Sequence, residues 1–259
     1  MEQVASRQQH APRQGRGAST VSSRRRAEAF GARIDAAPVA RTGALFRNDA
    51  GRLLRMKALW WMAALMAALP ASFQVMMGSM AEFDPWGSVV GLTSSVVFVG
   101  TGIALALLVA EDWRSGFVKN VFAVSPNRGG YVLAKILAGG VANLIMVAGY
   151  VLGAALAGLL LHSTYATGFG DLLMAVLSKA AMGLFFSGLF VCVDIPCKHR
   201  AWLAVMTTCI IAMLFAPAML GTAMMPPIAA AGMSLAAAAI GVVAFRALAL
   251  LIMNGRDLV

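Results

Sequence analysis

Six long apolar segments restrict the fold of this chain more than any other feature. They cover residues 58–79, 88–110, 134–161, 172–193, 201–219 and 228–245. About 20 mostly apolar residues are enough for a helix to cross the hydrocarbon core of a bilayer. Backbone groups in lipid must be satisfied within the protein, and none of the six segments alternates like a barrel strand. The sequence therefore predicts an all-α membrane protein with six transmembrane helices.

The overall composition supports a membrane protein. Of the 259 residues, 60% are hydrophobic and 12% are charged, whereas a soluble domain has roughly 25% charged residues. This balance excludes a water-soluble monomer, a disordered chain and a disulfide scaffold. We expect a multi-pass membrane protein.

The connections between the segments predict the orientation. Lys and Arg are absent from 80–87, 162–171 and 220–227. The alternate connections carry basic residues, namely Arg114, Lys119, Arg128, Lys198, Arg200 and Arg256. Because cytoplasmic loops are enriched in Lys and Arg, both termini are expected in the cytoplasm.

The N-terminal region has a different character. Residues 1–57 hold 12 of the 21 Lys and Arg residues but only 4 of the 11 Asp and Glu residues. Residues 1–42 are predicted to be a disordered basic tail that is solvated or binds a partner or lipid. Residues 43–57 are predicted to form an amphipathic interfacial helix, and 58–259 the transmembrane domain. One face of that helix would hold Phe46, Ala50, Leu53 and Leu54. Beside a membrane span, such basic charge indicates anionic lipid rather than nucleic acid.

No motif for catalysis is present. The chain lacks the phosphate-binding G-x-x-x-x-G-K-[ST] pattern, H-E-x-x-H and G-x-S-x-G. The cysteines, Cys192, Cys197 and Cys209, lie in apolar surroundings and predict buried thiols rather than a metal site. We therefore expect no enzyme activity, no catalytic residues, no metal and no cofactor in this chain.

Two features stand out within the spans. Lys179 lies about two turns inside 172–193, where a charge costs roughly 2.5–3.5 kcal/mol. It is either a functional residue or a lysine that snorkels to the outer surface. Gly149 and Gly153 form a G-x-x-x-G pattern, which favours close approach of helices.

The connection after the second segment is the most informative. Glu111 ends the segment, and a short amphipathic stretch follows in which Phe117, Val118, Val121 and Phe122 are apolar and which Ser125-Pro126 terminates. The pattern predicts a surface helix able to transmit motion from a soluble partner, or else an ordinary interfacial loop. Phe117 and Phe122 are five residues apart, which places them about 140° apart on a helix. One would anchor in the lipid interface while the other faces a partner.

This connection resembles that of the permease subunits of type 2 ABC exporters (ABC-2 type). The matching residues are Glu111, Gly116, Lys119, Pro126, Arg128, Tyr131 and Lys135. The resemblance covers about residues 43–259 and includes the six spans, the preceding amphipathic helix and the closing Arg256-Asp257-Leu258.

The resemblance implies a function. The connection would be the cytoplasmic coupling helix, with Glu111, Gly116, Phe117, Lys119, Phe122, Pro126 and Arg128 at the contact with a separate ABC ATPase subunit. Glu111 would hold the helix through Lys119, Arg128 or Lys135, or else be a solvated carboxylate. The membrane would be the bacterial plasma membrane. The chain would pair with a second permease, as a homodimer or heterodimer, and export a lipophilic or amphipathic cargo such as a drug or antimicrobial peptide. The alternative is an integral membrane immunity or assembly factor that does not transport.

Overall fold

The chain is all-helical wherever its structure is described. The computed structural model describes residues 38–77, 84–91, 94–124, 128–198, 200–223 and 225–254. Every contact discussed below lies within one unit of the chain, Val39–Val259. Within these ranges there are helices and no strand, which confirms the all-α part of the predicted fold. The helices are α2 (Pro38–Arg55), α3 (Lys57–Met77), α4 (Pro85–Gly91), α5 (Ser94–Arg114), α6 (Phe117–Val124), α7 (Arg128–Leu160), α8 (Phe169–Cys197), α9 (Ala201–Ala223) and α10 (Pro227–Asn254).

Four helices are long and apolar enough to cross a membrane. They contain Val96–Arg114 of α5, and α7, α8 and α10 over their full lengths. The pair Thr42–Arg55 and Lys57–Ser72, bent by 65° at the junction of α2 and α3, would count as a fifth. The predicted span 201–219 corresponds to α9, of which Ala201–Phe215 is a shorter apolar helix. The chain is therefore a multi-pass membrane protein with four or five candidate spans in its described part.

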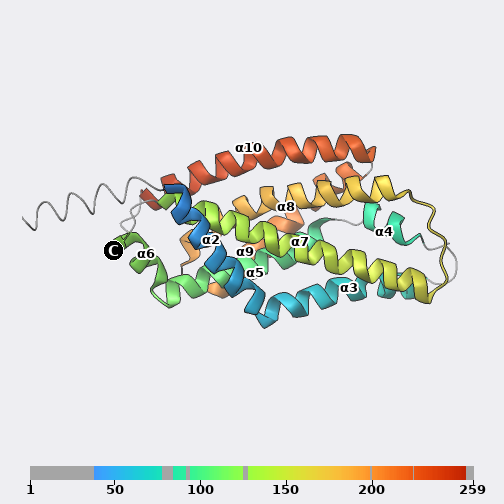
Figure 1. The fold of residues 1–259 in the computed structure, drawn as a ribbon, viewed down its shortest axis with the longest axis horizontal. Helices are drawn as coiled ribbons and strands as arrows, with labels where there is room; N and C mark the ends of the chain where they lie inside the picture. Colours follow the sequence, from blue (N-terminus) through green and yellow to red (C-terminus); the bar gives the residue numbers. More distant parts are fainter. Residues whose placement is uncertain are drawn as a thin grey trace, which may run out of the picture. The chain divides into compact units, whose positions relative to one another are not determined.

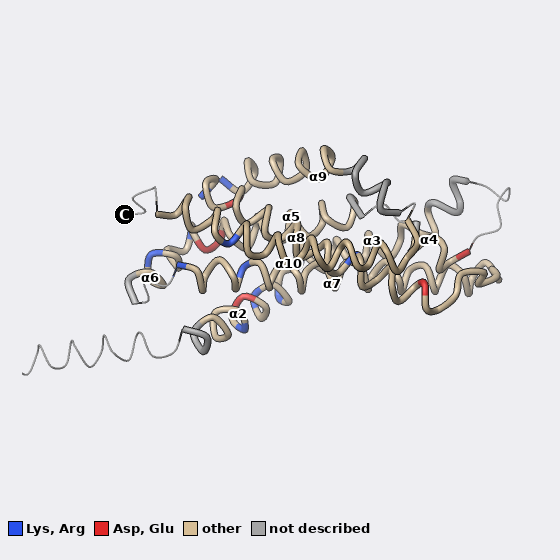
Figure 2. Tube along the Cα trace, turned by 90° about the horizontal axis from the view of Figure 1, so that it is seen from above, with Lys and Arg blue, Asp and Glu red and all other residues tan. Residues whose placement is uncertain are grey.

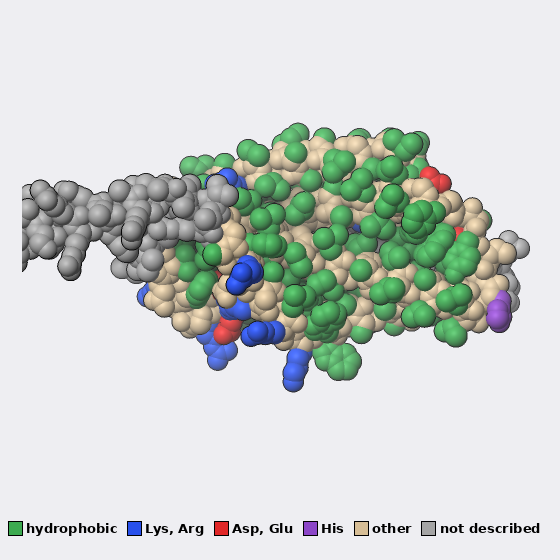
Figure 3. Space-filling view, in the orientation of Figure 1, with side chains coloured by type: hydrophobic (Ala, Val, Ile, Leu, Met, Phe, Trp, Pro, Cys, Tyr) green, Lys and Arg blue, Asp and Glu red, His purple; other side chains and the backbone are tan. Residues whose placement is uncertain are grey.

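The long helices run side by side, and α5 lies at their centre (Figure 1). Within its apolar window 67% of α5 is buried, against 17% for α10. Helix α5 packs against α7, α8 and α9, whereas α10 packs mainly on α8. Hydrophobic side chains cover most of the face seen in Figure 3, as expected of a surface that meets lipid.

Helix α7 approaches α3 closely at Gly149 and Gly153. A Cβ atom on Gly149 would lie 2.8 Å from the backbone oxygen of Ala63, and one on Gly153 would lie 2.0 Å from that of Ala67. The G-x-x-x-G pattern thus meets small residues of α3 within the same chain. Close contact of backbones is the usual role of small residues between membrane helices.

Helix α2 is amphipathic, and its buried face differs from the predicted one by one residue. Leu53 is fully buried, whereas Leu54 is 45% exposed. Consecutive residues of a helix point about 100° apart, so only one of the two leucines can face the bundle. The buried side of α2 also carries Asp49, which is 1% exposed. The polar set that surrounds Asp49 is described in the next section.

Asp84 joins two connections at the end of the bundle where α4 lies. Its carboxylate accepts hydrogen bonds from the backbone N–H of Trp86 (3.1 Å), the backbone N–H of Thr167 (2.9 Å) and the Thr167 hydroxyl. Burial alone would raise the pKa of Asp84, but the donors on Thr167, Gly87 and Trp86 outweigh it and lower the pKa below 3.8. The connection is therefore present at neutral pH and is lost only as the pH falls through that lowered pKa.

The close contact between α3 and α7 predicts that adding one methyl group to α7 at this contact destabilises the protein. We expect Gly153→Ala to lower the free energy of unfolding by about 1–3 kcal/mol, because the new Cβ collides with backbone that cannot rotate away. The measurement is chemical denaturation of the purified protein in detergent micelles. Gly232→Ala in α10 is the matched control, since a Cβ there meets open space. Equal stability of the two variants would contradict the close packing of α3 on α7.

Candidate functional site

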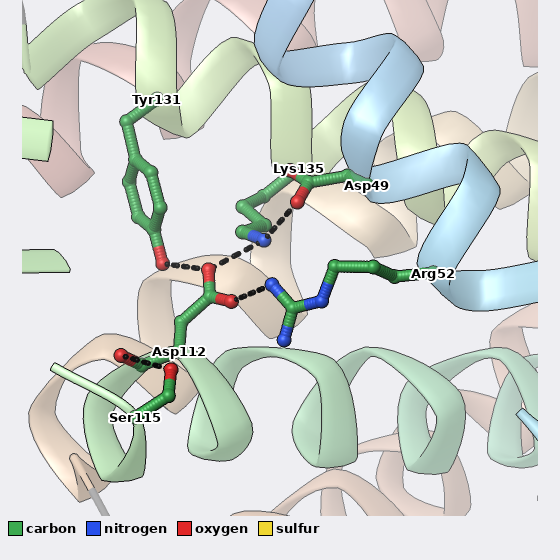
Figure 4. A network of polar contacts seen from close by, with 6 residues as sticks. All are labelled: Asp49, Arg52, Asp112, Ser115, Tyr131 and Lys135. Atoms are coloured by element: carbon green, nitrogen blue, oxygen red, sulfur yellow. Dashed lines mark hydrogen bonds and ion pairs between the residues drawn. The ribbon is translucent and has the colours of Figure 1, made fainter. Parts of the chain in front are cut away.

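Five polar side chains from three helices meet at the end of the bundle where α2 and α6 lie (Figure 4). The Lys135 Nζ lies 2.6 Å from Asp112 Oδ2 and 2.8 Å from Asp49 Oδ1. Tyr131 donates its hydroxyl hydrogen to Asp112 Oδ2 at 3.0 Å, and Arg52 donates to Asp112 Oδ1. We call these five residues the ion cluster. It ties α2 and α5 to α7.

The ion cluster is buried and its formal charges balance. Lys135 and Asp112 have no exposed surface, and the Arg52 side chain is 30% exposed. Two carboxylates face one ammonium and one guanidinium, so no net charge is enclosed. Removing one member of such a set leaves an uncompensated buried charge, which typically costs 3–5 kcal/mol. The cluster therefore links the three helices in the conformation described.

Local sequence explains how the cluster assembles. Tyr131 and Lys135 are four residues apart on α7, and Asp49 and Arg52 are three apart on α2, so each pair shares a helical face. Asp112 lies in the last turn of α5, where that helix reaches the basic end of the bundle. Figure 2 shows Lys and Arg gathered at this end.

Glu111 forms none of the three predicted ion pairs among the described residues and is an exposed carboxylate instead. The acid that pairs with Lys135 is its neighbour Asp112. Because adjacent helical residues point about 100° apart, only one of the two acids faces α7. The predicted link between the end of α5 and Lys135 is thus present, but through Asp112.

Helix α6 is the predicted short surface helix, and Gly116 sets its direction. Gly116 has φ = 72°, in the left-handed region that favours glycine, directly after the last turn of α5. Its N–H donates to the Trp113 carbonyl at 3.3 Å, and its own carbonyl accepts from Asn120 at 3.2 Å. The chain therefore turns sharply between α5 and α6. Val118 is buried, whereas Lys119 and Asn120 are exposed.

Both predicted aromatic residues of α6 are half-buried against the chain itself. The Arg52 guanidinium lies over the Phe117 ring at 5.7 Å. Phe122 packs edge-on against Tyr131 at 5.6 Å. Each ring thus contacts a member of the ion cluster, which connects α6 to the cluster. Lys119 and Asn120, rather than the two rings, are the residues of α6 that extend outward.

Arg128 joins the start of α7 to the end of α10. It donates to the Met253 carbonyl at 2.6 Å and to Asn254 Oδ1 at 3.1 Å, and its guanidinium lies over the Phe122 ring at 5.8 Å. A cation at the last carbonyls of a helix is stabilising. Pro126, the remaining predicted residue of this connection, lies outside the described residues.

Lys179 is enclosed by protein in the interior of the bundle. Its side chain is 6% exposed, and Nζ lies 3.5 Å from the carbonyl oxygen of Val90 near the end of α4. Asn143 of α7 donates to the Lys179 backbone oxygen at 3.1 Å. Gly183 makes room for that amide, since a Cβ there would lie 2.1 Å from Asn143. A lysine at this position donates to the Val90 carbonyl, near the point where the short helix α4 ends.

Sequence reasoning did not single out Asp194 of α8. It is 1% exposed, and neither carboxyl oxygen has a hydrogen-bond partner in the described part of the chain. An acid within the apolar run Phe190–Ile195 was the available signal, but the predicted span ended at residue 193. Asp49 and Arg52 were also missed as site residues, because α2 was read as a surface helix.

The described residues contain no group of His, Cys, Asp and Glu arranged to bind a metal ion. The chain matches no known family model. Comparisons with curated proteins and with solved structures gave no match either. Residues and their geometry therefore carry the functional conclusion.

The two adjacent acids of α5 provide a direct test of the ion cluster. We expect Asp112→Ala to lower the free energy of unfolding by about 3–5 kcal/mol, because Lys135 is left buried with one carboxylate fewer. Glu111→Ala should stay within about 0.5 kcal/mol of the native protein, as is usual for exposed positions. Both values come from denaturation in detergent micelles. Equal losses at the two positions would show that the cluster does not stabilise the bundle.

Proposed function

We propose that this chain is the permease subunit of an ATP-driven exporter of the ABC-2 type. The observation that carries the proposal is the placement of α6. This short helix lies between two long helices, contacts the buried ion cluster through Phe117 and Phe122, and extends Lys119 and Asn120 outward. A force applied to α6 would reach α5, α7 and α2 through rigid, mutually dependent contacts.

The proposed mechanism assigns ATP binding to a separate ATPase chain. Closure of the ATPase subunits moves α6, and the ion cluster passes that movement to three helices together. A ligand shifts an equilibrium between two conformations only through its different affinity for them. Cargo would move along a path formed with a second permease, identical or paralogous. The scarcity of charge inside the bundle suits a lipophilic or amphipathic cargo.

The proposal includes six spans with both termini in the cytoplasm. In it α3, α4 with α5, α7, α8, α9 and α10 each cross the membrane, while α2 lies in the interface. The support is the distribution of basic residues along the sequence. It favours a cytoplasmic location for the end of the bundle where α2 and α6 lie.

Two exposed positions at opposite ends of the bundle test this orientation. In a chain whose three cysteines are replaced by alanine, Thr164→Cys should react with a membrane-impermeant thiol reagent on intact cells. Ser115→Cys should react only in inside-out vesicles. Both side chains are exposed, so access depends on the side of the membrane. Labelling of Ser115→Cys in sealed cells would overturn the orientation.

Partner capture tests the coupling role of α6. An affinity-tagged full chain, cross-linked in cells, should recover an ATPase that carries a G-x-x-x-x-G-K-[ST] motif, identified by mass spectrometry. Lys119→Glu should reduce the recovered ATPase at least tenfold, because one exposed contact residue often dominates a small interface. Arg200→Glu reverses the same charge at an exposed position outside α6 and should retain the ATPase.

Export gives a second, independent measurement. At equal membrane levels, Lys119→Glu should reduce efflux in proportion to lost ATPase. Phe117→Ala and Phe122→Ala should reduce efflux while ATPase is still bound, since both rings contact the ion cluster rather than solvent. Failure to recover any P-loop ATPase with the native chain would favour the immunity or assembly factor. Unchanged efflux in all three variants would remove the coupling role from α6.

A further inference from the structure

A groove runs between the junction of α2 with α3 and the last turns of α5. Its volume is about 450 Å³, and it is lined by Arg52, Arg55, Met56, Leu107, Leu108 and Glu111. Its lining combines the apolar side chains of Met56, Leu107 and Leu108 with two guanidinium groups on the α2 side and the Glu111 carboxylate on the α5 side. A surface of this kind fits a molecule that has both a charged group and a hydrocarbon chain.

The outer face of α2 continues the groove as a shallow hollow of about 670 Å³. Arg47, Gly51 and Arg55 follow one another at four-residue intervals on this face, with Arg52 beside them. A Cβ on Gly43 or Gly51 would meet nothing within 4 Å. Gly51 leaves space between Arg47 and Arg55, and Gly43 leaves space one turn before Arg47.

Two of these arginines have unused hydrogen-bond donors. Arg47 and Arg55 are exposed, and neither forms an ion pair with a residue in the described ranges. Arg52 is held by Asp112 but keeps part of its side chain exposed. Glu111 stands at the edge of the groove formed by α5, so a negative ligand would place its charge over α2. Arginine binds phosphate through several donors at once.

Aromatic residues place this groove at the level of lipid headgroups. Trp60 and Trp61, in the first turn of α3, are 53% and 76% exposed. The Trp60 indole N–H donates to the Leu54 carbonyl at 2.8 Å, which folds that ring back toward α2. Tryptophan is enriched at the boundary between hydrocarbon and headgroups. The arginines of α2 would then lie beside phosphates, and the apolar part of the lining would lie beside acyl chains.

We propose that the groove between α2 and α5 is a binding site for one anionic phospholipid. Its phosphate contacts Arg47, Arg52 and Arg55, and an acyl chain lies along Met56 and Leu107, the half-buried apolar residues of the groove. An anionic phospholipid fits because its negative headgroup complements the arginines and its hydrocarbon chain matches the apolar part of the lining. A free phosphate would leave the apolar part of the lining without a partner, and a zwitterionic lipid would gain less from the three guanidinium groups. The site does not depend on the ATPase and stands whether or not the chain is an exporter.

Binding of phosphatidylglycerol to the purified full chain in neutral detergent tests the site. Native mass spectrometry during a titration measures its affinity, with phosphatidylcholine as the comparison. Each basic residue near a headgroup contributes about a fivefold change in affinity. Arg47→Gln with Arg55→Gln should therefore weaken phosphatidylglycerol binding about 25-fold. Gly51→Leu should also weaken it several-fold without any change in charge, because the side chain fills the hollow.

A second double variant controls for overall charge. Arg200→Gln with Arg246→Gln removes two exposed arginines outside the groove and should keep the affinity within about twofold. Equal weakening by both double variants would overturn the site in favour of a diffuse positive field. Equal binding of phosphatidylcholine would overturn the need for an anionic headgroup. Displacement of the lipid by inorganic phosphate at equal concentration would mean a small-anion site instead.

Discussion

The buried ion cluster is the interaction on which the rest of the bundle depends. Asp49, Arg52, Asp112 and Lys135 bring two charges of each sign together; Asp49, Asp112 and Lys135 are buried, and Arg52 is partly exposed. Each of them is tolerable only because the others are present. As a result α2, normally the kind of helix that lies loosely on a membrane, is fastened to α5 and α7. The bend of 65° between α2 and α3 follows, since α3 must turn away to enter the bundle.

In that arrangement α6 and the groove between α2 and α5 share one contact residue, Arg52. Arg52 contacts Asp112 with its guanidinium, lies over Phe117 of α6 and lines the groove. Arg52 therefore belongs to the ion cluster and also contacts both the proposed coupling helix and the proposed lipid site. A bound headgroup and a bound ATPase would act on neighbouring atoms of the same network. Coupling of this kind needs two arrangements of the cluster with different affinities for the two ligands.

Sequence alone could predict the all-α class, a short helix after α5 and the close approach of α7 through its glycines. These depend on hydrophobic periodicity and on small residues, which are local properties of the chain. It could not decide between Glu111 and Asp112, because that choice depends on which direction α5 presents to α7. Nor could it find Asp49, since its partner Lys135 lies far away along the chain. The outward placement of Lys119 rather than the two aromatic rings likewise depends on tertiary packing.

The separation of the cluster's members along the chain has a consequence for biogenesis. Arg52 and Asp112 are 60 residues apart, and Tyr131 follows Asp112 by 19. When α5 leaves the insertion machinery, Asp112 has Arg52 available but not yet Lys135. Asp49, which is buried in the finished protein, pairs with the same lysine. The charges balance only when the first part of α7 has been delivered, because before that point two acids, Asp49 and Asp112, have only Arg52 as a partner, which leaves one acid in excess. An incomplete chain is therefore chemically distinguishable from a finished one, which gives quality control a feature to detect.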